Sequence, residues 1–252
     1  MAIINPRMIG AVTTSVLLGL STTGQTASPH HVTTTTPPAL QLAVVSGFVP
    51  ALSPFLHTLQ QRVARPIQLQ TGSMEQIYHF LQQPTAPDVI ITANATLMQQ
   101  AIGAGRVDAK SVRAIGHTIP VLWCPSPHVL FRVSWRDTLK QPQLRTLASP
   151  TPLTNPLGAL LATLHPLPPQ VRLMATTQGI DAWRLARRGQ ADCALTVRGL
   201  VSAADRFQVI SEGDIQIYAA MSRKSQSPQA AQQLLTVLSS PMVQAQLRRQ
   251  GY

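Results

Sequence analysis

The chain has 252 residues and carries 20 lysines and arginines against nine aspartates and glutamates, which gives a formal net charge of +11. This excess favours an anionic solute or partner, or it reflects adaptation of the surface to its compartment. Nucleic acid is not an expected partner. Aromatic residues make up only 4% of the chain, and the basic residues are scattered instead of clustered for stacking and phosphate contacts.

The N-terminus has the layout of a secretory signal peptide. Arg7 precedes the apolar run 8–20 and a small, polar stretch, and the run is too short to span a bilayer comfortably. We therefore expect residues 1–27 to be a signal peptide and the polar, proline-rich residues 28–38 to form a flexible leader. Neither cysteine lies at the signal-peptide boundary, so a lipid anchor is not expected.

From residue 40 onwards the hydrophobic period alternates between strand and helix. Pro50 and Ser73 suit the first position and the N-cap of two helices. The elements predicted before residue 106 are strands at 40–46, 67–72 and 87–94 and helices at 50–64, 73–83 and 95–105. The short links between them predict an α/β layer with a parallel sheet.

The pattern changes at residues 117–125 to longer apolar strands interrupted by prolines. A helix at 180–188, closed by Gly189, is then followed by a strand to Val197, and the chain ends with a strand at 214–222 and two amphipathic helices. A second α/β lobe inserted into the first explains this change. The expected division is lobe 1 at 39–123 plus 214–252 and lobe 2 at 124–213.

The two cysteines leave two alternatives open. Cys124 and Cys193 each lie in an apolar segment. They can form one disulfide in an oxidising compartment, or they can remain as two buried thiols.

Patterns for catalysis and resident metals are missing from the sequence. The acidic residues are spread singly, and there is no G-x-S-x-G, H-E-x-x-H or P-loop motif. His30 and His31 are adjacent, but they fall in the expected leader, where they bind a stray ion at most weakly. Asp88, beside a strand start, is expected to be a structural hydrogen-bonding group. We therefore expect no enzyme, no cofactor and no resident metal.

Several segments carry a further signal through their order and spacing, namely LAVVSGFVPAL, QLQTGSMEQI, APDVIITANATLM, IPVLWCP, ASPTPLTNPLGALLATL, GIDAWRLARRGQADCALTV and SPMVQAQLRRQGY. Together they resemble the periplasmic molybdate-binding proteins of bacterial ABC importers, which are type II periplasmic solute-binding proteins. The resemblance implies two lobes joined by hinge segments, each lobe a mostly parallel sheet flanked by helices. It also implies a periplasmic monomer that captures an oxyanion, molybdate or tungstate, in the interlobe cleft and delivers it to a membrane permease.

The resemblance also implies where the solute is held. The turns VSGF and TGSM each open a helix, and a helix N-terminus offers unpaired N–H donors to a dianion without a formal countercharge. Glycine and serine in such turns are also ordinary connecting chemistry. The family's ligand positions fall on residues that lack the side-chain hydroxyls expected at three of them: Gly47, Met74, Leu157, Ile180 and Val197.

Neighbouring polar residues can take over the missing hydrogen bonds. Ser46 and Ser73 each precede a predicted position by one residue, and Thr196 and Arg198 lie at the end of a predicted strand. An arginine at the cleft would suit an organic carboxylate or phosphate, whereas an arginine beyond a strand end is often simply solvated. Two other functions therefore stay open. One is a binder of another small anion, and the other is a ligand-free sensory or interaction module.

Overall fold

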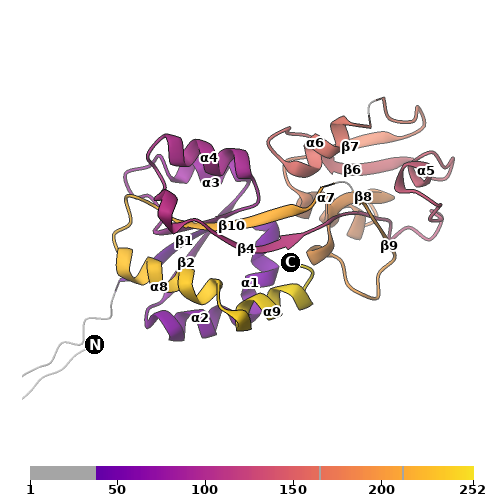
Figure 1. Cartoon of the computed structure of the whole chain (residues 1–252). Helices are drawn as coiled ribbons and strands as arrows, with labels where there is room; N and C mark the ends of the chain where they lie inside the picture. Colours follow the sequence, from indigo (N-terminus) through magenta and orange to yellow (C-terminus); the bar gives the residue numbers. More distant parts are fainter. Residues whose placement is uncertain (1–37, 165, 212) are drawn as a thin grey trace, which may run out of the picture. The chain divides into compact units, whose positions relative to one another are not determined.

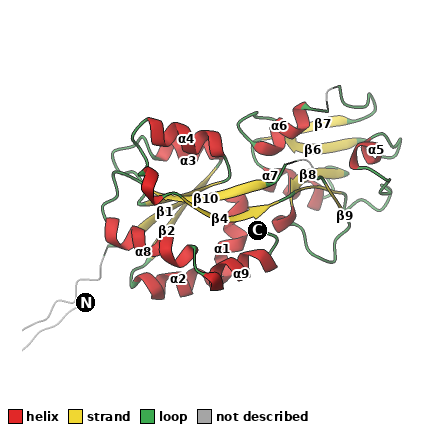
Figure 2. Cartoon of the chain, in the orientation of Figure 1, coloured by secondary structure: helices red, strands yellow, loops and turns green. Residues whose placement is uncertain are grey.

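The computed structural model describes residues 38–164, 166–211 and 213–252 (Figure 1). The predicted signal peptide, and all of the predicted leader except residue 38, therefore lie outside the described residues. The described residues belong to one compact unit. They build two sheets, each of five strands and each flanked by helices, which is the two-lobed architecture of periplasmic binding proteins (Figure 2).

The first sheet has the strand order β2-β1-β3-β10-β4. Its strands are β1 (Leu40–Val45), β2 (Ile67–Gly72), β3 (Val89–Thr92), β4 (Arg113–Thr118) and β10 (Ile215–Met221). β1 runs parallel to β2 and β3. β10 arrives from the C-terminal part of the chain and pairs antiparallel with both β3 and β4.

Helices cover both faces of the first sheet (Figure 1). Successive residues of β1 show why, since Leu42 and Val44 belong to one apolar cluster and Ala43 to another on the opposite face. The helices are α1 (Val49–Leu52), α2 (Leu56–Val63), α3 (Met74–Phe80), α4 (Ala95–Gly103), α8 (Pro228–Leu238) and α9 (Pro241–Arg249).

The helix predicted at 50–64 is broken into α1, a 3-10 turn at Ser53–Phe55 and α2. Pro54 explains the break, because proline has no N–H to donate and its ring clashes with the preceding helical turn.

The second sheet has the strand order β7-β6-β8-β5-β9. Its strands are β5 (Pro120–Trp123), β6 (Thr146–Pro150), β7 (Arg172–Thr176), β8 (Cys193–Val197) and β9 (Phe207–Val209). The helices beside it are α5 (Trp135–Leu139), α6 (Pro156–Ala162) and α7 (Gly179–Arg187). β6 runs parallel to β7 and β8, and β5 pairs antiparallel with β8 and β9.

Each sheet is mostly parallel, as the resemblance implied, and contains one antiparallel strand, β10 in the first sheet and β5 in the second. One detail differs from the sequence prediction. The four residues of β5, which the predicted division placed in lobe 1, pair within the second sheet. The chain therefore passes from the first sheet to the second at Ile119, between β4 and β5.

Two long-range links join segments that are far apart in the sequence, one in each lobe. Cys124, next to β5, forms a disulfide with Cys193 of β8, which settles the alternative that the sequence left open. Asp88 is buried and accepts hydrogen bonds from the Gln41 N–H at 2.9 Å, the Ser225 hydroxyl at 2.6 Å and the Ser227 N–H at 3.0 Å. It joins β1 to the start of α8, which is the structural role expected of it.

Candidate functional site

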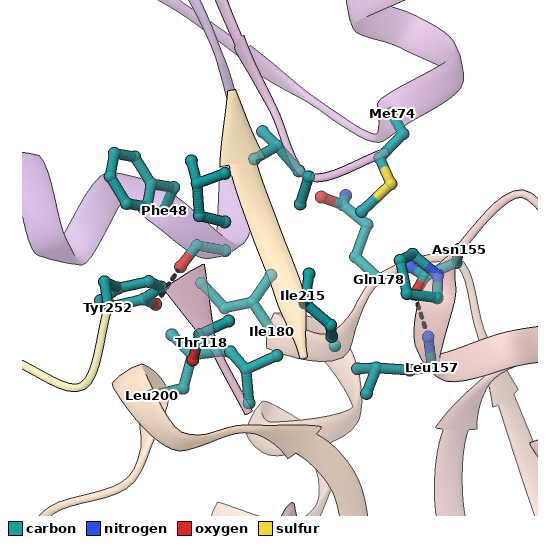
Figure 3. A pocket seen from close by; sticks show the side chains of 17 residues that line it. Phe48, Met74, Thr118, Asn155, Leu157, Gln178, Ile180, Leu200, Ile215 and Tyr252 are labelled. Carbon is teal, nitrogen blue, oxygen red and sulfur yellow. Dashed lines mark hydrogen bonds between the residues drawn. The ribbon is translucent and has the colours of Figure 1, made fainter. Parts of the chain in front are cut away.

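A cavity of about 50 Å³ lies between the lobes (Figure 3). Lobe 1 contributes the turn after β1, the start of α3, parts of β4 and β10, and the C-terminal residue, while lobe 2 contributes the starts of α6 and α7 and the end of β8. A volume of this order holds roughly three water molecules. The cavity therefore suits a small solute.

All five positions implied by the family resemblance lie on the wall of this cavity: Gly47, Met74, Leu157, Ile180 and Val197. They come from segments far apart in the sequence, which the two sheets bring together at one point. Their side chains offer a thioether and aliphatic groups but no hydroxyl. Any polar contact from these residues to a solute must therefore come from the backbone.

Ser46 and Ser73 do not replace the missing hydroxyls. The Ser46 hydroxyl donates to the Gly72 carbonyl oxygen at 3.1 Å, which ties the two opening turns together. The Ser73 hydroxyl donates to the Glu75 carboxylate at 2.8 Å and accepts from the Gln76 N–H at 3.2 Å. Both hydroxyls are thus committed within lobe 1, and neither serine lies on the cavity wall.

Arg198 and Thr196 are also occupied elsewhere. The Arg198 guanidinium lies 4.7 Å from the centre of the Phe207 ring and donates to the Val201 carbonyl oxygen at 2.5 Å. Arg198 is absent from the cavity wall. Thr196 is fully buried, and its hydroxyl donates to the Gly179 carbonyl oxygen at 3.0 Å. That bond anchors the first residue of α7 to β8.

The helices that start at the cavity differ in how their first N–H groups are satisfied. Ser73 and Gln76 form a capping box on α3. On α6, the Asn155 side-chain oxygen accepts from the Leu157 N–H at 3.0 Å (Figure 3), so this predicted ligand amide already has a partner.

No side chain caps α7, although Gln178 stands at its N-cap. The N–H groups of Asp181 and Ala182 donate to the Gln178 carbonyl oxygen at 3.1 and 3.2 Å. Gly179 and Ile180 precede them, and no acceptor within the helix is available to their N–H groups. Both residues line the cavity. The start of α7 therefore presents a partial positive charge and amide donors to a solute.

Two polar side-chain atoms on the wall are buried without a hydrogen-bond partner among the described residues. They are the Thr118 hydroxyl oxygen and the Gln178 side-chain carbonyl oxygen. In Figure 3, Thr118 lies towards Tyr252 and Leu200, whereas the Gln178 amide lies beside Met74. The two groups therefore approach the cavity from different sides.

The C-terminal Tyr252 closes one side of the cavity and touches both lobes. Its hydroxyl donates to the Gly47 carbonyl oxygen at 2.6 Å, and its ring meets Phe48 edge-on, with the ring centres 5.1 Å apart. A β-carbon on Gly199 of lobe 2 would lie 1.9 Å from the Tyr252 ring, so only glycine fits there. Burial raises the pKa of the Tyr252 hydroxyl, which therefore stays protonated.

Thr154 makes a second contact between the lobes, at the rim. Its hydroxyl donates to the Glu75 carboxylate, and its carbonyl oxygen accepts from the Asn94 side-chain amide. Burial acts to raise the pKa of the Glu75 carboxyl group. The hydrogen bonds from Thr154, the backbone N–H of Glu75 and Ser73 outweigh burial and hold this pKa below its usual value. Glu75 therefore remains an acceptor for Thr154 at neutral pH.

Sequence reasoning did not single out Thr118, Asn155, Gln178 or Tyr252 as residues of the site. Asn155 before a proline was a readable N-cap signal. Tyr252 belongs to a segment that carries the resemblance, but the resemblance did not place it on the wall of the cavity. For Thr118 and Gln178 the sequence holds no distinguishing signal, since their importance rests on the absence of a partner in the folded chain.

The fold and the cavity between the lobes define a solute-binding protein. The family model for bacterial extracellular solute-binding proteins matches residues 40–252. The chain belongs to this family, and its members serve ABC transporters. No curated protein sequence matches it.

Solved structures show the same fold. The Azotobacter vinelandii periplasmic molybdate-binding protein is 17% identical, with a TM-score of 0.74 over 84% of this chain and 98% of that one. The sulfate-binding protein SubI from Mycobacterium tuberculosis is 14% identical, with a TM-score of 0.66 over 84% and 85% of the two chains. PEB3, a Campylobacter jejuni protein solved with L-phospholactate, is 10% identical, with a TM-score of 0.63 over 84% and 98%. At these identities the likeness establishes the fold alone.

Across the described residues, no helix has the length and apolar character needed to cross a membrane, and no group of three or more metal-ligating side chains gathers.

Proposed function

We propose that this chain is an exported, periplasmic carrier that captures a small anion in the interlobe cavity and delivers it to the membrane permease of an ABC importer. It acts as a monomer without catalytic activity. The solute proposed first is molybdate or tungstate, on the strength of the sequence resemblance and the fold shared with molybdate binders.

One observation carries the anion proposal. None of the described residues on the cavity wall carries a charged side chain, and α7 begins there without a side-chain cap. The first amides of α7 can thus hold negative charge without a countercharge. A cationic or zwitterionic solute would find no aspartate or glutamate side chain among the described residues of this wall, and burying its charge unpaired would be costly.

The aliphatic part of the wall favours a second candidate. Hydrogen bonds to a charged group are worth about 1.5–3 kcal/mol each. An oxyanion such as molybdate carries oxygens on every side. Some of these oxygens would face the side chains of Met74, Val197 and Leu200, which offer no donor to replace the water lost on binding. A small organic anion would place its charged end at α7 and its apolar body against these side chains. The PEB3 complex with L-phospholactate is an instance of an organic anion in a protein of this fold.

The test is thermal unfolding of the purified protein with molybdate, tungstate, sulfate, phosphate, acetate or L-lactate in excess. A solute at 100 times its dissociation constant adds about 2.7 kcal/mol. In a domain of this size that raises the unfolding temperature by about 5–10 °C. A rise with molybdate and tungstate supports the first candidate, and a rise with the carboxylates alone supports the second. No rise with any anion contradicts the proposal and favours the sensory or interaction module.

A matched pair of variants ties such a response to the cavity. A β-carbon added at Gly47 or at Gly103 meets no atom within 4 Å, so both positions have room for the first carbon of an aspartate side chain. Gly47 lies on the cavity wall, whereas Gly103 ends α4 and does not. Gly47→Asp should abolish the anion response by charge repulsion, while Gly103→Asp, with the same change in net charge, should keep it.

A further inference from the structure

Thr118 is the last residue of β4, next to the point where the chain passes between the sheets. It is 3% exposed, and its hydroxyl has no hydrogen-bond partner within the described part of the chain. Strand pairing sets it opposite Ile215 of β10, and both residues line the interlobe cavity. Thr118 therefore brings a polar atom to a stretch of wall that is otherwise aliphatic.

A buried hydroxyl without a partner destabilises a folded protein, and such groups are rare in native structures. Valine has nearly the same shape as threonine, favours strands equally well and carries no such penalty. The hydroxyl at residue 118 therefore calls for a partner outside the chain, and the cavity is the space into which that partner fits.

Two other buried threonines provide comparisons for Thr118. The Thr196 hydroxyl has an internal acceptor, the Gly179 carbonyl oxygen at 3.0 Å. Thr92 is 2% exposed and its hydroxyl also lacks a partner, but it lies beside Met98 at a smaller hollow under α3 and α4. Thr92 thus matches Thr118 in burial and in its unpaired hydroxyl, and differs in its position relative to the solute.

We propose that Thr118 is a ligand-contacting residue, whose hydroxyl donates a hydrogen bond to an oxygen of the bound anion. This inference rests on the proposed anion-binding function. Thr118 supplies a neutral side-chain donor from β4, whereas the side chains of Gly47, Met74 and Val197 supply none. It also defines the solute more closely, as an anion with an oxygen directed at β4 in addition to those held by the amides of α7.

The experiment compares the wild-type protein with Thr118→Val, Thr118→Ser and Thr92→Val. Isothermal titration uses whichever of molybdate, tungstate, sulfate, phosphate, acetate and L-lactate the wild type binds most tightly. Thr118→Val should weaken binding at least ten-fold, which corresponds to about 1.4 kcal/mol. Thr118→Ser keeps the hydroxyl and should stay within about three-fold of the wild type, and Thr92→Val should bind as the wild type does.

Thermal unfolding without added anion shows whether a loss of affinity comes from a lost contact with the anion or from disturbed packing of the protein. Both valine variants remove an unpaired buried hydroxyl, so neither should lower the unfolding temperature. Equal affinity of Thr118→Val and the wild type would overturn the inference. So would equal losses in Thr118→Val and Thr92→Val, since they would indicate a general packing effect. If the wild type binds none of the anions, the proposed function fails first and this inference falls with it.

Discussion

Replacing Tyr252 by phenylalanine removes one hydroxyl from the junction of the two lobes. That hydroxyl donates to the Gly47 carbonyl oxygen at 2.6 Å, while the ring packs against Phe48 and Gly199 and should keep its place. A typical internal hydrogen bond contributes about 0.5–1.5 kcal/mol. We expect Tyr252→Phe to lower the free energy of unfolding by about 1 kcal/mol and the unfolding temperature by about 2–4 °C.

The pH dependence gives this prediction a second, independent readout. Burial raises the pKa of Tyr252 in the folded state above the usual value of 10.0. Its contribution to stability is therefore fully present below the pKa of the unfolded chain and is lost as the pH rises through the pKa of the folded state. The difference between wild type and Tyr252→Phe should be constant from about pH 5 to pH 9 and should shrink above about pH 10.

Chemical denaturation at a series of pH values measures this difference, with Tyr78→Phe as the control. Tyr78 lies on α3, and its hydroxyl makes no hydrogen bond with the described residues. A Tyr252→Phe variant as stable as the wild type at neutral pH would refute the reasoning. So would a stability difference that grows with alkaline pH, since burial would then not oppose ionisation.

Other predictions concern stability. Removing the Cys124–Cys193 disulfide, which spans 69 residues, should cost about 4 kcal/mol in unfolding free energy by the loop-entropy relation, measured by denaturation of the double serine variant. Asp88→Ala should cost about 3 kcal/mol, because three partly buried donors lose their buried acceptor, and the same denaturation checks it. Glu75 has a lowered pKa, so its contribution is present above the usual pKa of 4.5 and is lost as the pH falls through the folded-state value. Glu75→Gln and Thr154→Val should both weaken the dependence of the unfolding free energy on pH in that acidic range, measured by chemical denaturation at a series of pH values.

The order of elements was predictable because local pattern and short links determine it. Alternation between apolar strands and amphipathic helices gave lobe 1 up to α4 almost completely. The parallel direction of most strands followed from the strand and helix alternation, but the antiparallel direction of β10 did not, since its residues read the same whether they pair parallel or antiparallel. The crossing of the chain from the first sheet to the second at Ile119 was not predictable for a related reason. Residues 117–125 form one apolar run, and only pairing with β8 and β9 assigns β5 to the second sheet.

The resemblance pointed to five residues that line the cavity, but it did not predict the hydrogen bonds of their polar neighbours. Ser46 is one residue from the predicted contact, and its hydroxyl instead reaches Gly72, 26 residues further along the chain. The Arg198 guanidinium packs over the Phe207 ring. In each case a nearby partner from another segment takes the group away from the cavity, and such partners become visible only once the strands are placed.

Helix capping limits how this cavity can bind a solute. A first-turn N–H that its own chain satisfies stabilises the fold but is lost to the ligand. Ser73 and Gln76 satisfy donors of α3, and Asn155 satisfies Leu157 on α6. Among the described residues on the wall, the starts without a side-chain cap are those of α7 and of the 3-10 turn Ser46–Phe48 that leads into α1. An anion bound here would draw its hydrogen bonds from these two helix starts and from a neutral hydroxyl such as that of Thr118. With donors concentrated in this way, affinity should depend on where a solute carries its charge more than on how much charge it carries.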